Sequence, residues 1–298
     1  MVMAPNVPDL AMDQARLAFP SLTFVNKIGV GGQKQVFRAV DQDGLKVVAK
    51  FVQIDYFWVD DVTVMQNTEA ETRTWREIGL MRRYSSQYLP SLYPDEPRVV
   101  DFAGLRYICY AENHAGKDSV ADLLRSDGTL SEVSVIKLVH DVAAALSLYH
   151  FDKIVHRDVK PQNIVFDDER DCFVLIDGGV HLAPGNATIT HGYVPGTQAY
   201  YSPEQARGER RGLDCRSDQF SLGITAYEAL TGSNPFAIDA TDFLQFDNNR
   251  ANAIYRVLDS ARFSERTIHL VQKLLQKHPH NRFRDPERLL SELEGIGE

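Results

Sequence analysis

Hydrophobic and polar residues alternate in two different ways along this chain. Up to about residue 110, short runs rich in Val, Ile and Phe are separated by turns that contain glycine or aspartate, a pattern typical of strands joined by hairpins. One charged segment in this region, residues 67–84, carries Trp75, Ile78 and Met81 at helical spacing and predicts a single helix. We expect strands at residues 24–28, 36–40, 45–52, 98–102 and 106–110.

The helical period dominates from residue 119 onward. In residues 131–151, apolar side chains recur every three or four positions, and Ser131 provides an N-cap. Residues 267–276 form a second amphipathic run. Two short apolar runs, residues 164–166 and 173–176, predict a pair of strands inside this helical region. Most predicted strands therefore precede residue 111, and most predicted helices follow it.

Composition narrows the class of protein. The chain has 298 residues, of which 44% are hydrophobic and 24% charged, as in ordinary globular proteins, and its net charge is −9. An acidic balance argues against a nucleic-acid or anionic-membrane partner. Three scattered cysteines match no metal pattern, residues 1–20 lack the features of a secretory signal, and no apolar run is long enough to cross a bilayer. We therefore expect a cytoplasmic protein.

The segment His156–Asn163 gathers several groups suited to phosphate chemistry. Asp158 is a carboxylate that can accept a proton from a hydroxyl, and Lys160 is a point positive charge. Asn163 offers a neutral oxygen of the kind that Mg²⁺ prefers. Arg157 can hold a phosphate or carboxylate bidentately. The spacing His-Arg-Asp-x-Lys-x-x-Asn resembles the catalytic loop of eukaryotic-type (Hanks-type) protein kinases.

A glycine-rich hairpin near the N-terminus resembles the phosphate-covering loop of the same family. Such a hairpin can lie close over phosphates because it lacks side chains and offers backbone N–H groups. Gly29, Gly31 and Val36 match the kinase pattern Gly-x-Gly-x-x-Gly-x-Val. The third glycine is replaced by Lys34, although Gly32 adds flexibility.

Lys50 ends an apolar strand and therefore needs a partner. It resembles the kinase lysine that contacts the α- and β-phosphates and pairs with a glutamate on the following helix. Glu77 is our preferred partner and Glu71 remains an alternative. The resemblance also implies that the nucleotide contacts three further residues, namely Ile28, Ala49 and, through the hinge, Glu112.

Asp177 follows an apolar strand and precedes two glycines, which resembles the Mg²⁺-binding Asp-Phe-Gly element of kinases. In this chain the phenylalanine is replaced by Gly178. Metal binding depends on the aspartate, so we expect magnesium binding to be retained. In kinases the phenylalanine normally helps to set the active or inactive state. Its absence puts that switch between states in doubt for this chain.

Residues 196–204 resemble the platform on which kinases rest a peptide substrate. By this resemblance, Thr197 bridges the catalytic aspartate and lysine, and Glu204 forms a buried ion pair with Arg282. Asp218 resembles the aspartate that opens the central helix and holds the backbone of the catalytic loop. A simple N-cap role for Asp218 is the alternative.

The resemblance runs from about residue 22 to 293 and implies an α+β fold with two lobes: a small antiparallel β lobe with one helix, and a larger, mainly helical C-terminal lobe, with Mg-ATP between them. The lysine two residues after the catalytic aspartate indicates serine/threonine specificity. We expect residues 1–20 to be an N-terminal extension and residues 21–298 to be the kinase domain, divided into an N-lobe (21–110), a hinge (111–118) and a C-lobe (119–298).

By the same resemblance, Lys50 and the glycine-rich loop hold the ATP phosphates, while Asn163 and Asp177 hold Mg²⁺, with Mn²⁺ as the alternative ion. Asp158 orients the hydroxyl of a protein substrate and takes its proton. Arg157 would anchor a phosphate on the activation loop, where Thr188 or Thr190 is the predicted site of autophosphorylation.

Two other functions remain open at this stage. Lys34 and Gly178 motivate a catalytically impaired kinase fold that serves as a binding scaffold. A phosphotransferase for small molecules would share the fold, but it would not need the platform for a peptide. The sequence does not reveal the substrate, the activating signal or the oligomeric state.

Overall fold

The computed structural model describes residues 9–31, 33–58, 61–66, 68–113, 116–177, 197–208, 213–237 and 240–294. The chain divides into two compact units. The first comprises Met1–Ser86 and Pro90–His114, and the second comprises Gln87–Leu89 and Ala115–Glu298. Each is described in turn.

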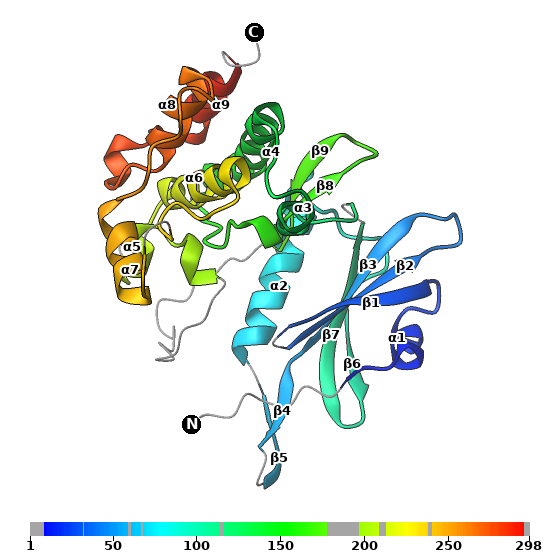
Figure 1. Ribbon diagram of the computed structural model, residues 1–298. Coiled ribbons are helices and arrows are strands. Elements are labelled where there is room, and N and C mark those ends of the chain that lie inside the picture. The colour runs from blue at the N-terminus through cyan, green and yellow to red at the C-terminus, as the bar shows by residue number, and fades with distance from the viewer. Residues whose placement is uncertain are drawn as a thin grey trace. The chain divides into compact units, whose positions relative to one another are not determined.

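The first unit is built on a five-stranded antiparallel sheet in the order β1-β2-β3-β7-β6. Two helices belong to this unit, α1 (Met12–Ala18) and α2 (Thr68–Arg83), and Figure 1 shows them on opposite sides of the sheet. The strands are β1 (Thr23–Gly31), β2 (Lys34–Val40), β3 (Lys46–Gln53), β6 (Arg98–Phe102) and β7 (Leu105–Asn113).

The two faces of this sheet carry different cores because successive side chains of a strand point to opposite sides. One face packs the aromatic rings of Phe37 and Phe51 against α1 and the residues beside it, including Phe19. The described part of the N-terminal segment is thus packed on the sheet. The other face packs Ile108 and Tyr110 against apolar residues of α2.

A second hairpin, β4 (Asp55–Trp58) with β5 (Asp61–Gln66), lies outside the strands expected from the sequence. Its start is fixed by Asp55, whose carboxylate accepts hydrogen bonds from Nε and Nη2 of Arg106, both at 2.8 Å. This bidentate ion pair links the hairpin to β7, a partner distant in sequence that no local pattern could indicate.

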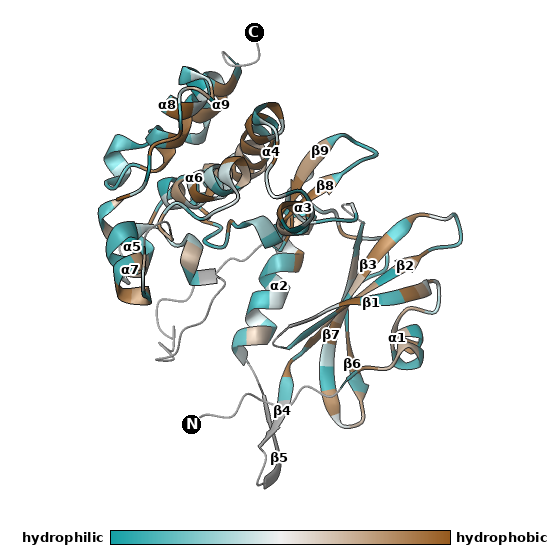
Figure 2. Ribbon diagram, viewed as in Figure 1, coloured by the Kyte–Doolittle hydropathy of each residue, from teal (hydrophilic) through white to brown (hydrophobic). Residues whose placement is uncertain are grey.

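The second unit is mainly helical and surrounds α6 (Cys215–Thr231). Most residues of α6 are buried, and Gly223 lies so close to α8 that an added Cβ would be 2.8 Å from the Cβ of Leu274. In Figure 2 hydrophobic residues dominate α4, whereas α2 of the first unit is mostly hydrophilic. The other elements are α3 (Val120–Asp127), α4 (Glu132–Phe151), α5 (Pro203–Ala206), α7 (Phe243–Asn252), α8 (Glu265–Leu274) and α9 (Pro286–Glu294), three short 3₁₀ helices, η1 (Pro161–Asn163), η2 (Thr197–Tyr200) and η3 (Pro279–Asn281), and the hairpin of β8 (Ile164–Asp167) with β9 (Cys172–Leu175).

The chain enters this unit past a glycine that no other residue could replace without strain. Gly116 has φ +112°, and an added Cβ would lie 2.0 Å from the carbonyl oxygen of Phe166. The backbone can approach β8 only because this side chain is missing. Among the described helices, none has the length and apolar character needed to cross a membrane.

Candidate active site

In the first unit, a buried lysine lies between two carboxylates. The side chain of Lys50 is 3% exposed, and its Nζ lies 3.2 Å from Oε1 of Glu77 and 2.8 Å from Oε1 of Glu112. Tyr110 donates a hydrogen bond from its hydroxyl to Oε1 of Glu77 at 2.8 Å. A buried ammonium is tolerated only with such partners, because desolvation of an unpaired charge is costly.

The structure places Glu77, and not Glu71, beside this lysine. Both belong to α2, but six residues on a helix correspond to about 120° around its axis, so the two side chains point in different directions. Glu77 lies next to Ile78, which is buried against the sheet. The orientation of the helix, fixed by its apolar face, therefore selects the glutamate.

The carboxylate of Glu112 pairs with Lys50 at the end of β7. We expected the hinge to begin at residue 111, but β7 continues to Asn113. This end of β7 pairs with β3 and also bonds to residues 91–93. Tyr93 N donates to Ala111 O, and Asn113 N donates to Ser91 O, both at 2.9 Å. The expected contact of the Glu112 backbone with the nucleotide stays a prediction.

Ala49 does not lie with Lys50. It is fully buried in the core on the opposite face of the sheet, together with Phe37 and Phe51. Neighbours in a strand point to opposite faces, so the residue that shares the face of Lys50 is Val48, which pairs with Glu112 across β3 and β7. We therefore replace Ala49 by Val48 in the candidate set.

The glycine-rich hairpin is formed by β1 and β2, with Gly29 opposite Val36 and Gly31 opposite Lys34. The register shifts between Lys27 and Gly29, and the intervening Ile28 is exposed. An added Cβ at Gly29 would meet only ordinary contacts with Val36. Gly32 lies outside the described residues.

In the second unit, the catalytic-loop candidates lie together around Asp158. Lys160 donates from Nζ to both carboxylate oxygens of Asp158, each at 2.9 Å. Asn163 donates from Nδ2 to the backbone oxygen and to Oδ2 of the same aspartate, also at 2.9 Å. These bonds fix the direction of a carboxylate whose side chain is 15% exposed, as a proton acceptor requires.

A fully buried aspartate on α6 holds the backbone of this loop. Asp218 accepts hydrogen bonds from His156 N at 2.8 Å, Arg157 N at 2.7 Å and His150 Nε2 at 2.8 Å. Burial alone would raise the pKa of Asp218, but these donors and the nearby imidazoles bring it below its ordinary value. The N-cap of α6 is Asp214, four residues earlier, so the simple capping role is wrong for Asp218.

Arg157 has φ +67°, a left-handed conformation that is costly for a residue with a side chain. The hydrogen bond that Arg157 N donates to Asp218 stabilises it, and Gln205, just after the platform, adds another by donating from Nε2 to Arg157 O at 3.2 Å. Burial lowers the pKa of the Arg157 guanidinium. His150 and Gln205 were not identified from the sequence, because neither belongs to the quoted catalytic-loop motif.

Asn163 and Asp177 flank the β8–β9 hairpin, and the residue before Asp177, Ile176, donates from its N to Asn163 O at 2.9 Å. Both hydrogen bonds that Asn163 makes to Asp158 use Nδ2, which leaves the amide oxygen to face elsewhere. One amide and one carboxylate oxygen suit Mg²⁺, which takes its remaining ligands from phosphates and water. Across the described ranges, no three His, Cys, Asp or Glu side chains form a metal cluster.

The predicted ion pair of the platform is present in the second unit. Arg282 donates from Nη1 to Glu204 Oε1 at 2.6 Å and from Nη2 to Oε2 at 3.1 Å, and its guanidinium stacks over the Phe220 ring at 4.6 Å. Burial alone would raise the pKa of Glu204, but the bonded Arg282 lowers it below the ordinary value. Ser217 adds a hydrogen bond to the same carboxylate.

Several predicted residues lie outside the described part of the chain. They are Gly178, Thr188 and Thr190. The backbone of Thr197 begins η2, but its side chain is not described. The bridge from Thr197 to the catalytic aspartate and lysine, the activation-loop phosphosites and the effect of Gly178 therefore stay predictions.

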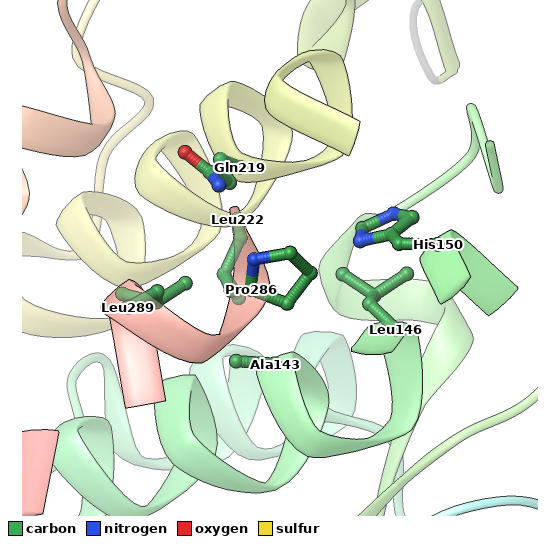
Figure 3. A pocket seen from close by; sticks show the side chains of 7 residues that line it. All are labelled: Ala143, Leu146, His150, Gln219, Leu222, Pro286 and Leu289. Carbon is green, nitrogen blue, oxygen red and sulfur yellow. The ribbon is translucent and has the colours of Figure 1, made fainter. Parts of the chain in front are cut away.

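A cavity in the helical core is too small to hold a substrate. Figure 3 shows it between α4, α6 and α9, and its volume is about 10 Å³, the size of a single water molecule. Its lining includes His150 and Gln219 together with the apolar side chains of Ala143, Leu146, Leu222, Pro286 and Leu289. None of the site residues predicted from the sequence lines this cavity.

Curated relatives of this chain are bacterial serine/threonine kinases. Serine/threonine-protein kinase PknB of Mycolicibacterium smegmatis is 33% identical over 178 residues, which are 59% of this chain and 28% of the relative. Serine/threonine-protein kinase pkn3 of Myxococcus xanthus is 32% identical over 286 residues, 90% of this chain and 48% of the relative. A probable serine/threonine-protein kinase of Clostridium acetobutylicum is 28% identical over 272 residues, 91% of this chain and 39% of the relative.

This chain thus spans less than half the length of each of these relatives. The family model of the protein kinase domain matches residues 22–292, nearly the whole sequence. The paired Lys50, the Asp158 loop and the buried Glu204–Arg282 pair lie within this match. The chain belongs to the protein kinase domain family.

Proposed function

We propose that this chain is a serine/threonine protein kinase that transfers the γ-phosphoryl group of ATP to hydroxyls of protein substrates. The observation that carries the proposal is the arrangement of Asp158, whose carboxylate is held by Lys160 and Asn163 while Asp218 holds the backbone before it. The names of the curated relatives support serine/threonine specificity.

The proposed mechanism relies mainly on positioning and charge. Phosphoryl transfer passes through a loose transition state, so the protein has to hold the reactants and neutralise charge. Lys50, positioned by Glu77, binds the phosphates. Asp158 orients the attacking hydroxyl and accepts its proton, and Lys160 offsets negative charge on the transferred group.

The metal assignment rests on the donor atoms. Asn163 and Asp177 would hold Mg²⁺, with Mn²⁺ as the alternative ion, and the cation would neutralise phosphate charge. We further propose that Arg157 binds a phosphate on Thr188 or Thr190. A cytoplasmic location agrees with three free cysteines, because reduced thiols are typical of that compartment.

Autophosphorylation tests the proposal directly. Purified protein would be incubated with Mg-ATP and mapped by mass spectrometry, beside Asp158→Asn and the control Asp168→Asn. Asp168 is an exposed aspartate in the β8–β9 turn. We expect Asp158→Asn to lower the rate by about 10²–10⁴-fold, the usual contribution of a positioned base. The control should retain full activity.

The outcomes separate the competing functions. Loss of activity in Asp158→Asn alone supports the kinase. Nucleotide binding without transfer, in every variant and with any protein acceptor, would favour the catalytically impaired scaffold. Transfer to aminoglycosides but not to proteins would favour a small-molecule phosphotransferase.

A further inference from the structure

Lys34 stands where the family pattern has its third glycine, and its side chain joins the charge cluster around Lys50. The two lysines project from the same face of the sheet, because Lys34 and Val36 are two residues apart on β2 and Val36 pairs with Lys50 on β3. Nζ of Lys34 lies 3.6 Å from Oε1 of Glu77, the same oxygen that lies 3.2 Å from Nζ of Lys50. One carboxylate oxygen therefore pairs with both ammonium groups.

The backbone at this position needs no glycine. Lys34 is not among the residues with positive φ, and it pairs with Val52 in the regular ladder between β2 and β3. A side chain can therefore be carried here without strain. The replacement removes the bare backbone that a glycine would offer to a phosphate and adds a positive charge on the same face.

In this cluster the ammonium groups of Lys34 and Lys50 lie beside the carboxylates of Glu77 and Glu112. Lys50 is 3% exposed and has Glu112 at 2.8 Å in addition to Glu77, so its charge is already strongly compensated. The side chain of Lys34 is 23% exposed and its ion pair with Glu77 is longer. A phosphate that approaches this face can reach the ammonium of Lys34 with a smaller desolvation cost than that of Lys50.

We propose that Lys34 is a second phosphate-binding lysine, which contacts the phosphate chain of the nucleotide together with Lys50. Glu77 is the shared counter-ion that positions both side chains. This assignment deepens the proposed kinase function and rests on its nucleotide-binding part. The chain lacks the third glycine of the family pattern, and Lys34 in its place supplies a positive charge for the phosphates. This charge adds to that of Lys50, which is paired with Glu112.

Nucleotide binding by calorimetry on the intact chain tests the proposal without relying on catalysis. Titrations with ATP, ADP and adenosine would compare the wild type with Lys34→Gln and Lys34→Gly, the latter restoring the family residue. The matched control is Lys46→Gln, an exposed lysine at the start of β3. We expect Lys34→Gln to weaken ATP binding by about tenfold or more, as for the loss of a charged hydrogen bond, and to leave adenosine binding unchanged.

A double-mutant cycle of Lys34→Gln and Lys50→Met tests whether Lys34 is the second lysine that binds the phosphates. That variant alone should still bind ATP more tightly than adenosine, and only the double variant with Lys34→Gln should lose this difference. Thermal unfolding of each variant without nucleotide shows whether the substitution lowers the stability of the fold itself.

Three results would overturn the inference. These are equal weakening of ATP and adenosine binding in Lys34→Gln, unchanged ATP affinity in that variant, or a wild type that binds ATP no more tightly than adenosine. A wild type that binds ATP as described but transfers no phosphate would refute the kinase proposal and leave the role of Lys34 standing.

Discussion

Asp218→Asn should destabilise the second unit and misplace the catalytic loop. The wild-type carboxylate is fully buried and accepts three hydrogen bonds, two of them from the backbone of His156 and Arg157. Asparagine keeps one acceptor oxygen but turns an NH₂ group toward the remaining donors. Asparagine has nearly the same size and shape as aspartate, so the substitution changes charge and hydrogen bonding but not packing.

The magnitude follows from these bonds. Hydrogen bonds to a charged group contribute about 1.5–3 kcal/mol each, and at least one of the three is lost. Its donor then remains buried and faces another donor. The strained φ of Arg157 costs a further amount of order 1–3 kcal/mol that the wild-type bonds offset. We expect the free energy of unfolding to fall by about 3–5 kcal/mol, as when a buried charged partner is removed.

Urea unfolding followed by circular dichroism at a helical wavelength measures this change, and kinase activity is assayed in parallel at low temperature. Asp214→Asn is the matched control because Asp214 caps the same helix, where asparagine is an equally good N-cap. The control should lose less than about 1 kcal/mol. A loss below about 1 kcal/mol in Asp218→Asn, with activity retained, would refute the role assigned to this carboxylate.

Three further predictions concern buried charge and backbone strain. Arg282→Met leaves Glu204 buried without its bidentate partner and should lower the free energy of unfolding by about 3–5 kcal/mol. The control Arg284→Met, at the surface, should lower it by less than about 0.5 kcal/mol. Because the pKa of Glu204 is lowered in the folded state, its ion pair stabilises the protein above the ordinary value of 4.5 and this contribution is lost as pH falls through the folded pKa. The urea midpoint should therefore drop on acidification, and less steeply in Glu204→Gln. Gly116→Ala should cost more than about 2 kcal/mol, since its Cβ would clash with a carbonyl, whereas Gly208→Ala, also at positive φ but with nothing within 4 Å, should cost about 1 kcal/mol.

Each of these has a contradicting result. Equal losses in Arg282→Met and Arg284→Met would deny that the buried pair matters. A midpoint that rises on acidification would reverse the sign assigned to Glu204. Equal costs for Gly116→Ala and Gly208→Ala would show that the close approach to β8 is absent in solution.

Local periodicity was sufficient to locate most regular elements. The expected strand at residues 98–102 matches β6, and the expected helix at residues 131–151 matches α4 with its N-cap Ser131. These predictions succeed because hydrophobic spacing and capping act between neighbours in the chain. The β4–β5 hairpin was missed because its anchor, the bond of Asp55 to Arg106, joins residues far apart in sequence.

The misplaced residue of the candidate site has a similarly plain cause. Ala49 was assigned to the nucleotide by the family resemblance, although strand alternation puts it on the face opposite Lys50. The hinge was expected from residue 111, because nothing in the local sequence indicates that β7 continues to Asn113. The alternation was available in the sequence, whereas the length of the strand was not.

By itself, the sequence determined which chemical groups the chain carries and in what order: the Asp158 loop, the buried lysine, the platform and the departures at Lys34 and Gly178. Only the tertiary structure decided which of these groups meet. It selected Glu77 from the glutamates of α2, brought Glu112 and Lys34 into the cluster of Lys50, and directed Asp218 to the loop backbone. Ion pairs and hydrogen bonds depend on distances of a few ångströms between side chains from distant segments, and those distances are fixed by packing.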